Sequence, residues 1–548
     1  MGTFLEGSLT EGILSDYYEK VIYALVHKVD LKAHVRSFMG KYDENICNFA
    51  EPEFSGKYLD LCCKIYERYQ NEKALKHAEM LVQSILEYMD EEGYIGCLIK
   101  GHEFHAFSVW NQMFTIMGLL SFYRVTGRKD SLEAAMRCAD YVMSHFMEKG
   151  EDLFDCLNNG VQHSCILYVL PDLYELTKEE RYKNDMTYII NRFRHSDLNF
   201  LEFTDIFALR SQKGIEILLI LMGILKYAVL CGDAGAIESV KRYWKQVWDT
   251  QIRNTGNATM NEVWTKNGNA AAMLDKEQKP NETCVAVGWI ELSLCLFDIT
   301  KEAQYLNAID KSLYNHILAS ISENGDDFAY YQPNYGKKIR TTGQGLYKCC
   351  RYRGFTLFTY MPQMLMYMDD KCMIPMIYTN AEFETDGIKI EEKNNYPFEN
   401  AMQLTISSEH ELDTELCLRV PEDYEISEIY LNEQPISLCM KNGYATIKLQ
   451  SQRKYKIEWK LDAKIVVEHG MIENQSMIAV RYGQVLLALK DEEGKISLSK
   501  EKLYFKRSKG DSYLCFDAIG YQDGKERNVE FTDYASADGY RVWIPIIE

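Results

Sequence analysis

Apolar residues recur at helical spacing, at positions i, i+3, i+4 and i+7, from about residue 10 to residue 368. One arrangement repeats along this region: an apolar helix that ends in an aromatic residue, a short polar corner, and a second helix. The spacing predicts about twelve helices, near residues 12–29, 57–70, 73–89, 107–125, 129–147, 163–176, 179–193, 212–231, 234–250, 283–299, 302–321 and 352–368.

Twelve helices in six hairpins predict a closed (α/α)6 barrel, with an open superhelical array as the alternative. Long loops of unequal length separate the hairpins. In a closed barrel such loops gather at one mouth, and long loops in a compact domain usually carry function. We therefore expect the functional residues on loops 90–107, 148–162, 194–211, 251–282 and 322–351.

The apolar period changes to two after about Asp370, as in the stretch 444–449, and turn residues such as Asn442-Gly443 separate the alternating segments. This pattern predicts a β-sandwich. The predicted fold class is therefore multidomain α + β. An (α/α)6-barrel catalytic domain spans residues 1–368, and a C-terminal β-sandwich region of one or two jelly-roll-like modules spans residues 369–548.

Charge and composition argue against several partner classes. Lys and Arg number 61 against 81 Asp and Glu, and the resulting net charge of −20 disfavours nucleic acid and anionic membranes as partners. No stretch reaches the roughly 20 apolar residues that span a bilayer. The acidic start of the chain does not match a signal peptide, and 16 cysteines without an export signal indicate reduced thiols. We expect a cytoplasmic protein, and a homodimer is one assembly that we allow for.

A carboxylate and three thiols form the sharpest candidate constellation: Glu282-Thr283-Cys284 and, far downstream, Cys349-Cys350. Zinc accepts such a four-ligand set, which is rich in soft sulfur. Lys348, Arg351 and Arg353 flank the cysteine pair and predict lowered thiol pKa values. The spacing matches no zinc-finger pattern, so a buried structural cysteine pair is the alternative.

Loop residues elsewhere add candidates for acid–base chemistry and sugar binding. Glu262 precedes Trp264 in a loop, and an apolar neighbour raises the pKa of a carboxyl group, as a general acid requires. Each of the remaining candidates, taken alone, is more often a core or surface residue. They are His and aromatic side chains on segments that we place at the mouth: His163, Tyr330, His105, Trp110 and Trp264.

Three common enzyme classes lack their motifs in this sequence. It contains no Gly-rich phosphate loop, no Gly-x-Ser-x-Gly elbow and no His-Glu-x-x-His helix. The usual nucleotide-binding, serine-hydrolase and metalloprotease interpretations are therefore excluded.

Taken in order along the chain, the motifs resemble glycoside hydrolase family 127 and its close relatives, the β-L-arabinofuranosidase group. The segments that carry the resemblance are Gly56-Lys57-Tyr58-Leu59-Asp60, Glu92-Gly93-Tyr94-Ile95-Gly96, His163 with Leu173-Tyr174-Glu175-Leu176-Thr177, Thr255-Gly256 followed by Glu262, Glu282-Thr283-Cys284, Cys349-Cys350, Leu418-Arg419-Val420-Pro421 and Val480-Arg481-Tyr482-Gly483.

The resemblance implies an (α/α)6 barrel followed by β-sandwich modules, and a retaining exo-glycosidase that releases β-L-arabinofuranose or a related sugar from small oligosaccharides. By carry-over, Zn²⁺ is held by Glu282, Cys284, Cys349 and Cys350, with Cys349 as the nucleophile and Glu262 as the acid/base. Retention requires a nucleophile on one face of the sugar and a proton donor on the other. Zinc coordination keeps a thiol deprotonated near neutral pH.

Several positions depart from the family pattern. Lys213 stands where alignment on Cys231-Gly232-Asp233 puts a substrate-binding histidine, Asn257 replaces a glycine, and Gln332 replaces an asparagine. We expect these positions in the sugar-contacting shell. A lysine in place of a neutral histidine predicts a substrate that carries a carboxylate.

Two other functions remain open. One is a non-hydrolytic sugar enzyme on the same barrel, of the epimerase or phosphorylase type, which would need no thiol–zinc cluster. The other is a carbohydrate-binding protein in which zinc only joins two loops.

Overall fold

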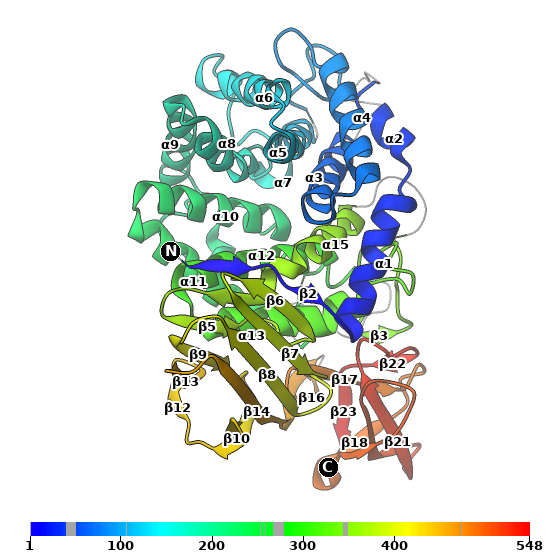
Figure 1. The fold of residues 1–548 in the computed structure, drawn as a ribbon. Helices are drawn as coiled ribbons and strands as arrows, with labels where there is room; N and C mark the ends of the chain where they lie inside the picture. Colours follow the sequence, from blue (N-terminus) through cyan, green and yellow to red (C-terminus); the bar gives the residue numbers. More distant parts are fainter. Residues whose placement is uncertain are drawn as a thin grey trace.

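The computed structural model describes residues 2–39, 51–105, 107–252, 254–257, 259–266, 279–342, 349–472 and 474–547. Helices occupy the N-terminal two thirds of the chain and gather in one part of the molecule, while the strands of the C-terminal third form the other part (Figure 1).

The helical part has two shells. The inner shell holds α3 (Glu51–Tyr69), α5 (Ser108–Thr126), α8 (Leu170–Thr177) with the 3-10 turn His163–Tyr168 before it, α10 (Gly214–Cys231), α12 (Thr283–Thr300) and α15 (Cys349–Tyr360). The outer shell holds α1 (Ile13–His27), α4 (Glu72–Tyr88), α6 (Lys129–Met147), α9 (Glu180–Arg194), α11 (Ala234–Thr250) and α13 (Ala303–Lys311). Short helical pieces are α2 (Leu31–Arg36), α7 (Leu157–Gly160), Ile206–Ala208, Ser312–Ile317, α14 (Leu318–Ser320) and Met361–Met364.

The inner helices close into a ring in chain order. α3 contacts α5, the turn before α8 contacts both α5 and α10, α10 contacts α12, α12 contacts α15, and α15 returns to α3. Each outer helix packs mainly on one inner partner: α4 on α3, α6 on α5, α9 on α8, α11 on α10, α13 on α12, and α1 on α15. This closed ring of six hairpins confirms the predicted (α/α)6 barrel and excludes the open array.

Three predicted helices are divided or shortened in the structure. The segment predicted at 163–176 begins as a 3-10 turn, and Pro171 then lies in the first turn of α8. The segment predicted at 302–321 is split by a π-helical stretch, Ser312–Ile317. The segment predicted at 352–368 ends as a helix at Tyr360, and Pro362 lies in the 3-10 turn that follows. Proline cannot donate a backbone hydrogen bond, which accounts for the two breaks at proline.

Burial explains the composition of the two shells. α5 and α12 are buried on most sides, whereas outer helices such as α11 bury one stripe. α10 and α12 are long and apolar enough to cross a membrane by length and composition, but 78% and 67% of those windows are buried within the protein. The barrel interior therefore accounts for their apolar character.

α3 and α5 approach each other closely through glycine. A Cβ atom at Gly118 would lie 2.6 Å from the backbone carbonyl oxygen of Gly56, closer than real contacts allow. Both positions therefore need glycine for the two inner helices to pack at this distance.

Two sheets follow the barrel and share a core with it. The six-stranded sheet has the order β1-β4-β5-β9-β13-β12 and the seven-stranded sheet the order β11-β10-β14-β8-β7-β6-β2. Buried residues alternate along the strands, as at Tyr455, Ile457 and Trp459 of β14. The strands are β1 (Thr3–Leu5), β2 (Ser8–Leu9), β4 (Met366–Met368), β5 (Cys372–Pro375), β6 (Ala381–Thr385), β7 (Ile388–Asn394), β8 (Ala401–Ser408), β9 (Asp413–Arg419), β10 (Tyr424–Leu431), β11 (Gln434–Pro435), β12 (Cys439–Lys441), β13 (Tyr444–Gln450) and β14 (Lys454–Ala463).

A third sheet, of ten strands, closes the chain with the order β15-β16-β23-β18-β20-β21-β17-β22-β3, and β19 pairs with β20. Its strands are β3 (Tyr335–Gly336), β15 (Ile465–Ile472), β16 (Gln475–Tyr482), β17 (Val485–Lys490), β18 (Ser497–Ser499), β19 (Lys506–Ser508), β20 (Cys515–Gln522), β21 (Lys525–Asp533), β22 (Tyr540–Arg541) and β23 (Ile544–Ile547).

The division of the chain differs from the predicted boundary in two places. The N-terminal strands β1 and β2 pair with β4 and β6, so residues assigned to the barrel by their position extend the C-terminal sheets. The barrel loop that contains β3 likewise pairs with β22. Tyr534 donates a hydrogen bond of 3.1 Å to the carbonyl oxygen of Pro333 in that loop. The C-terminal sheet therefore supports a loop of the barrel mouth.

Candidate active site

Glu282, Cys284, Cys349 and Cys350, called here the thiol cluster, meet in space although 65 residues of sequence separate Cys284 from Cys349. The Sγ atom of Cys284 lies 3.0 Å from that of Cys349 and 3.1 Å from that of Cys350. The Cys350 Sγ lies 4.0 Å from Oε1 of Glu282. The predicted meeting of the two loops is therefore present.

Two inner helices position the thiol cluster through their first turns. Glu282 is the N-cap residue of α12 and Cys284 lies in its first turn, while Cys349 and Cys350 begin α15. The backbone N–H of Cys284 donates to Cys350 Sγ over 3.3 Å. Unpaired N–H groups and the helix dipole favour negative charge at these ends, as thiolates and a carboxylate require.

The donor set fits a divalent cation that prefers sulfur. Oε2 of Glu282 is buried and has no hydrogen-bond partner among the described residues, so this oxygen is available as a ligand. Ligand atoms of Glu282, Cys284 and Cys350 all lie within 4.8 Å of one another, and the Sγ atom of Cys349 lies beside this group, 3.0 Å from that of Cys284. Zinc binds such sets tetrahedrally.

The expected net lowering of the thiol pKa values is wrong. Burial raises the pKa of Cys350 to about 12 and raises that of Cys284. The pKa of Cys349 is raised as well, by its hydrogen bond with Cys284 and by burial. Arg353 instead forms an ion pair with Glu291, and Lys348 lies outside the described residues.

The cation that reaches the nucleophile candidate is Lys57 of α3, which the sequence did not single out. Its Nζ lies 3.5 Å from Cys349 Sγ and also forms a buried ion pair with Glu53. A lysine four residues after a glutamate, on a helix that is buried on most sides, was the signal for this pair.

Glu262 lies at the tip of a two-residue hairpin. Met260 and Val263 exchange backbone hydrogen bonds of 3.0 and 3.2 Å, and both tip residues have positive φ, 49° at Asn261 and 71° at Glu262. Such a turn favours Asn or Gly, and a glutamate in this conformation costs about 1 kcal/mol or more. The tight turn therefore fixes the position from which the Glu262 side chain extends.

Neighbouring segments hold this hairpin on both sides. Gly214 N–H donates to the Glu262 carbonyl over 3.0 Å, and Asn261 N–H donates to the Lys279 carbonyl over 2.9 Å. The first bond fixes the hairpin to the start of α10. The second fixes it to the segment that leads to Glu282.

The Glu262 carboxylate accepts three side-chain hydrogen bonds. Lys213 Nζ bonds Oε2, while Tyr330 and Tyr331 donate to Oε1 over 2.9 and 2.6 Å. Burial raises the pKa of Glu262, but Lys213 and the two hydroxyl groups outweigh burial and hold that pKa below its ordinary value. The expected upward shift by Trp264 is therefore wrong. Lys213 is also already paired within the protein, although we expected its charge to face a substrate carboxylate.

Tyr330 joins the two parts of the site. Its hydroxyl group bonds Glu262, while its backbone carbonyl accepts hydrogen bonds from Thr283 N–H over 3.0 Å and from Cys350 Sγ over 3.8 Å. Tyr330 thus contacts the thiol cluster through its backbone carbonyl and the Glu262 carboxylate through its hydroxyl group.

The predicted sugar-binding residues of other segments lie in different surroundings. His163 is buried, with its ring centroid 5.5 Å from that of Phe146, and burial lowers its pKa to about 4. Trp110 and Trp264 are 4% and 2% exposed, so neither indole offers an open face for stacking. His105 is exposed and lies beside His102. A sugar-contacting role for these residues stays a prediction.

Two departures from the family pattern have structural roles rather than the expected sugar contacts. Asn257 is fully buried and its amide donates to the Glu282 carbonyl over 2.6 Å. Gln332 is fully buried and donates to the Ala319 carbonyl over 2.9 Å. Both side chains support the backbone that carries the site.

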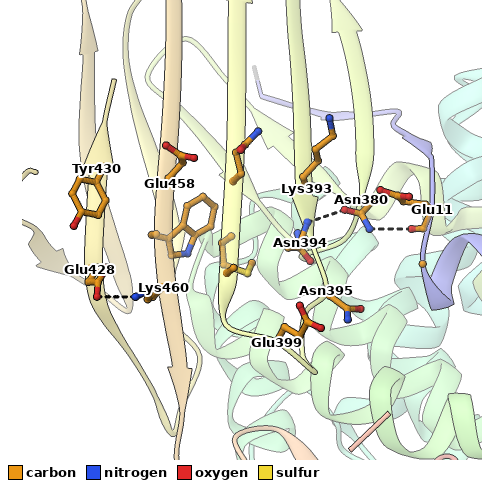
Figure 2. A pocket seen from close by; sticks show the side chains of 15 residues that line it. Glu11, Asn380, Lys393, Asn394, Asn395, Glu399, Glu428, Tyr430, Glu458 and Lys460 are labelled. Atoms are coloured by element: carbon orange, nitrogen blue, oxygen red, sulfur yellow. Dashed lines mark hydrogen bonds and ion pairs between the residues drawn. The ribbon is translucent and has the colours of Figure 1, made fainter. Parts of the chain in front are cut away.

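A hollow of about 800 Å³ lies elsewhere, on strands of the seven-stranded sheet (Figure 2). Its charged groups are partly paired across strands, as in the 2.8 Å ion pair of Lys460 with Glu428. Among the described residues that line it, none is a cysteine or histidine. It has the character of a solvated sheet face and adds no candidate nucleophile.

Comparison with known families agrees with this geometry. The family model described as β-L-arabinofuranosidase, GH127 catalytic domain, matches residues 16–363, and the GH127 middle-domain model matches residues 376–463. The chain belongs to glycoside hydrolase family 127. The GH127 middle-domain match spans β6 to β14, which are most of the strands of the first two sheets.

Individual relatives of this GH127 chain are distant in sequence. A non-reducing end β-L-arabinofuranosidase of Bifidobacterium longum is 22% identical over 405 residues, which are 64% of this chain and 59% of that protein. The crystal structure of Ara127N-Se, a GH127 β-L-arabinofuranosidase from Geobacillus stearothermophilus T6, covers 99% of this chain and 100% of its own, with 14% identity and a TM-score of 0.79. The GH127 β-arabinofuranosidase BT3674 covers 100% and 97%, with 16% identity and a TM-score of 0.80. These likenesses show the fold of this GH127 chain.

Proposed function

We propose that the chain is a retaining exo-glycosidase that releases β-L-arabinofuranose or a related sugar from small oligosaccharides. Cys349 is the nucleophile and Glu262 the acid/base. Glu282, Cys284, Cys349 and Cys350 hold zinc, which would keep the thiolate form of the cluster available near neutral pH.

The observation that carries the proposal is the position of Tyr330 between the thiol cluster and Glu262. A retaining mechanism needs a nucleophile and a proton donor on opposite faces of one sugar ring, a few ångströms apart. The thiol cluster and Glu262 both contact this one residue, the first at its backbone carbonyl and the second at its hydroxyl group.

The reaction follows from these two groups. Cys349 Sγ attacks the anomeric carbon while the bond to the leaving oxygen breaks, and Glu262 gives its proton to that oxygen. The Glu262 carboxylate then takes a proton from water, whose oxygen attacks the same carbon. The bond between sulfur and carbon breaks, and the thiolate is restored.

Nitrophenyl furanosides and pyranosides of arabinose and related sugars test this function. We expect turnover of a furanoside by the wild type and a loss of at least about 10³-fold in Cys349→Ser, because removal of a nucleophile costs that much or more. Cys515→Ser, at a buried cysteine of the third sheet, is the control and keeps activity.

Intact-mass analysis with a slow substrate tests the nucleophile directly. We expect a mass increase of one glycosyl residue on wild type, located on the peptide that contains Cys349. An active wild type that forms no such adduct, together with an active Cys349→Ser variant, would contradict the assigned nucleophile.

A further inference from the structure

A second buried carboxyl group, that of Glu216, interacts electrostatically with Lys213. Glu216 lies in the first turn of α10, three residues after Lys213, which is the N-cap residue of that helix. The N-cap and third positions of a helix bring their side chains together. The ammonium group that bonds Glu262 is therefore within reach of Glu216 as well.

Only one of the two carboxyl oxygens of Glu216 has a hydrogen-bond partner among the described residues. Its side chain is 2% exposed, and Oε1 accepts a hydrogen bond of 2.5 Å from the Asn158 amide. Oε2 is buried and has no hydrogen-bond partner among the residues that the structure describes. Asn158 adopts a left-handed backbone conformation, with φ 59° and ψ 40°, so a strained loop presents its amide to Glu216.

The surroundings of Glu216 disfavour a second negative charge. The charged or titratable groups that interact with it are Lys213 on its own helix, Glu262 on the hairpin, Glu282 at the start of α12, Glu53 on α3 and the Cys165 thiol. Burial raises the pKa of Glu216 to about 7, against the opposing effect of Lys213. One lysine thus serves two carboxyl groups, and the group without it retains a proton near neutral pH.

This arrangement bears on how Glu262 obtains the proton that a general acid needs. A general acid must be protonated before it acts, yet the Lys213 ion pair keeps Glu262 ionised. We propose that Lys213 moves from Glu262 to Glu216 when substrate binds, so that Glu216 is the proton store from which Glu262 becomes an acid.

The exchange balances without uptake of a proton from solvent. Lys213 Nζ gives one proton to Oε2 of Glu262 and takes the proton of Glu216, so that protonated Glu216 and ionised Glu262 become ionised Glu216 and protonated Glu262, and Lys213 begins and ends as a cation. Glu216 acts through Lys213 and is therefore a positioning residue. This inference rests on the proposed role of Glu262 as acid/base.

The first test compares leaving groups in Glu216→Gln, which keeps an oxygen for Asn158 but holds no exchangeable proton. We expect kcat to fall by about 10-fold or more on a glycoside with a poor leaving group, which needs the acid, and far less on a dinitrophenyl glycoside. The basic limb of the pH–rate profile should move to lower pH, because Lys213 then stays on Glu262.

The matched control is Glu392→Gln in β7, a buried glutamate that also has one unpartnered oxygen. It should leave both the leaving-group dependence and the pH profile unchanged. Equal losses on both glycosides in Glu216→Gln, with an unshifted profile, would give Glu216 a purely structural role and overturn the inference.

The second test locates the proton without catalysis. Difference infrared spectra at about pH 6, below the Glu216 pKa of about 7, should show a protonated-carboxyl band in wild type that is absent in Glu216→Gln. The band should also be absent in Glu262→Gln, because the freed lysine then pairs with Glu216. If Glu262→Gln retains the band, Lys213 does not move and the inference fails. Absence of turnover on every furanoside would instead refute the proposed function, and the infrared result would still report on the lysine.

Discussion

The two halves of the barrel mouth differ in how they hold the predicted site residues. From α10 onward, Lys213, Glu262 and Tyr330 are joined by hydrogen bonds, and Tyr330 connects them to the thiol cluster. Before α10, His163 and Trp110 are buried beside aromatic rings.

The difference shows which kinds of residue allow a functional site to be predicted from sequence. A carboxylate or thiol at the start of a buried helix must find a cation, a donor or a metal, because an unpaired buried charge is costly. A histidine or tryptophan on an apolar segment is satisfied by packing alone. Polar residues at helix starts were therefore the better guides to this site.

The largest effect should come from breaking the thiol cluster. We expect Cys284→Ser to lose most of its bound zinc, measured by elemental analysis of the purified protein, because serine is a poor ligand for zinc at neutral pH. Activity should fall with metal content, by at least about 10²-fold. Cys138→Ser, at a buried cysteine that bonds Gln112, is the control. Full zinc content in Cys284→Ser would remove this residue from the ligand set.

A smaller effect should come from removing one hydrogen bond to the Glu262 carboxylate. Tyr331→Phe removes a 2.6 Å hydrogen bond that lowers the pKa of Glu262, so that pKa rises. We expect the basic limb of the kcat/KM profile to move to higher pH by about one unit, since a hydrogen bond to a charged group contributes about 1.5–3 kcal/mol. Tyr444→Phe, whose hydroxyl group bonds the Lys301 carbonyl, should leave the profile in place. A shift to lower pH in Tyr331→Phe would contradict the assigned bond.

The smallest effect on catalysis should come from the other half of the mouth. We expect His163→Phe to keep the KM of wild type, because the ring packs beside Phe104 and Phe146. A clear rise in KM would instead make His163 a sugar contact and remove the contrast between the two halves.

Stability against acid gives a second measurement on the same variant. The pKa of His163 falls from 6.5 in the unfolded chain to about 4 in the folded protein, so the unfolded state binds more protons between these values. Wild type should lose up to about 3 kcal/mol through this group as the pH falls across that window. His163→Phe should lose less, as measured by denaturant unfolding at pH 7 and pH 4.

Most of the fold and part of the site could be predicted. The helix periods located all six hairpins, the residue types made the thiol cluster and Glu262 candidates, and the resemblance assigned their roles. Tyr331 stood beside Tyr330 in the same motif but carried no separate signal. The contact of Lys57 with Cys349 joins residues 292 positions apart, which no local pattern reveals.

Local sequence was enough for the helices, the strands and the family, because apolar spacing and short motifs express backbone geometry and near-neighbour chemistry. Closure of the helical ring decided the contacts between segments that are distant in sequence. It brought the starts of α12 and α15 together, paired Lys213 with Glu262, and lowered the pKa of Glu262 where its own neighbours predicted the opposite. Protonation depends on the charges that surround a group in space, and those charges come from segments that only the closed barrel brings together.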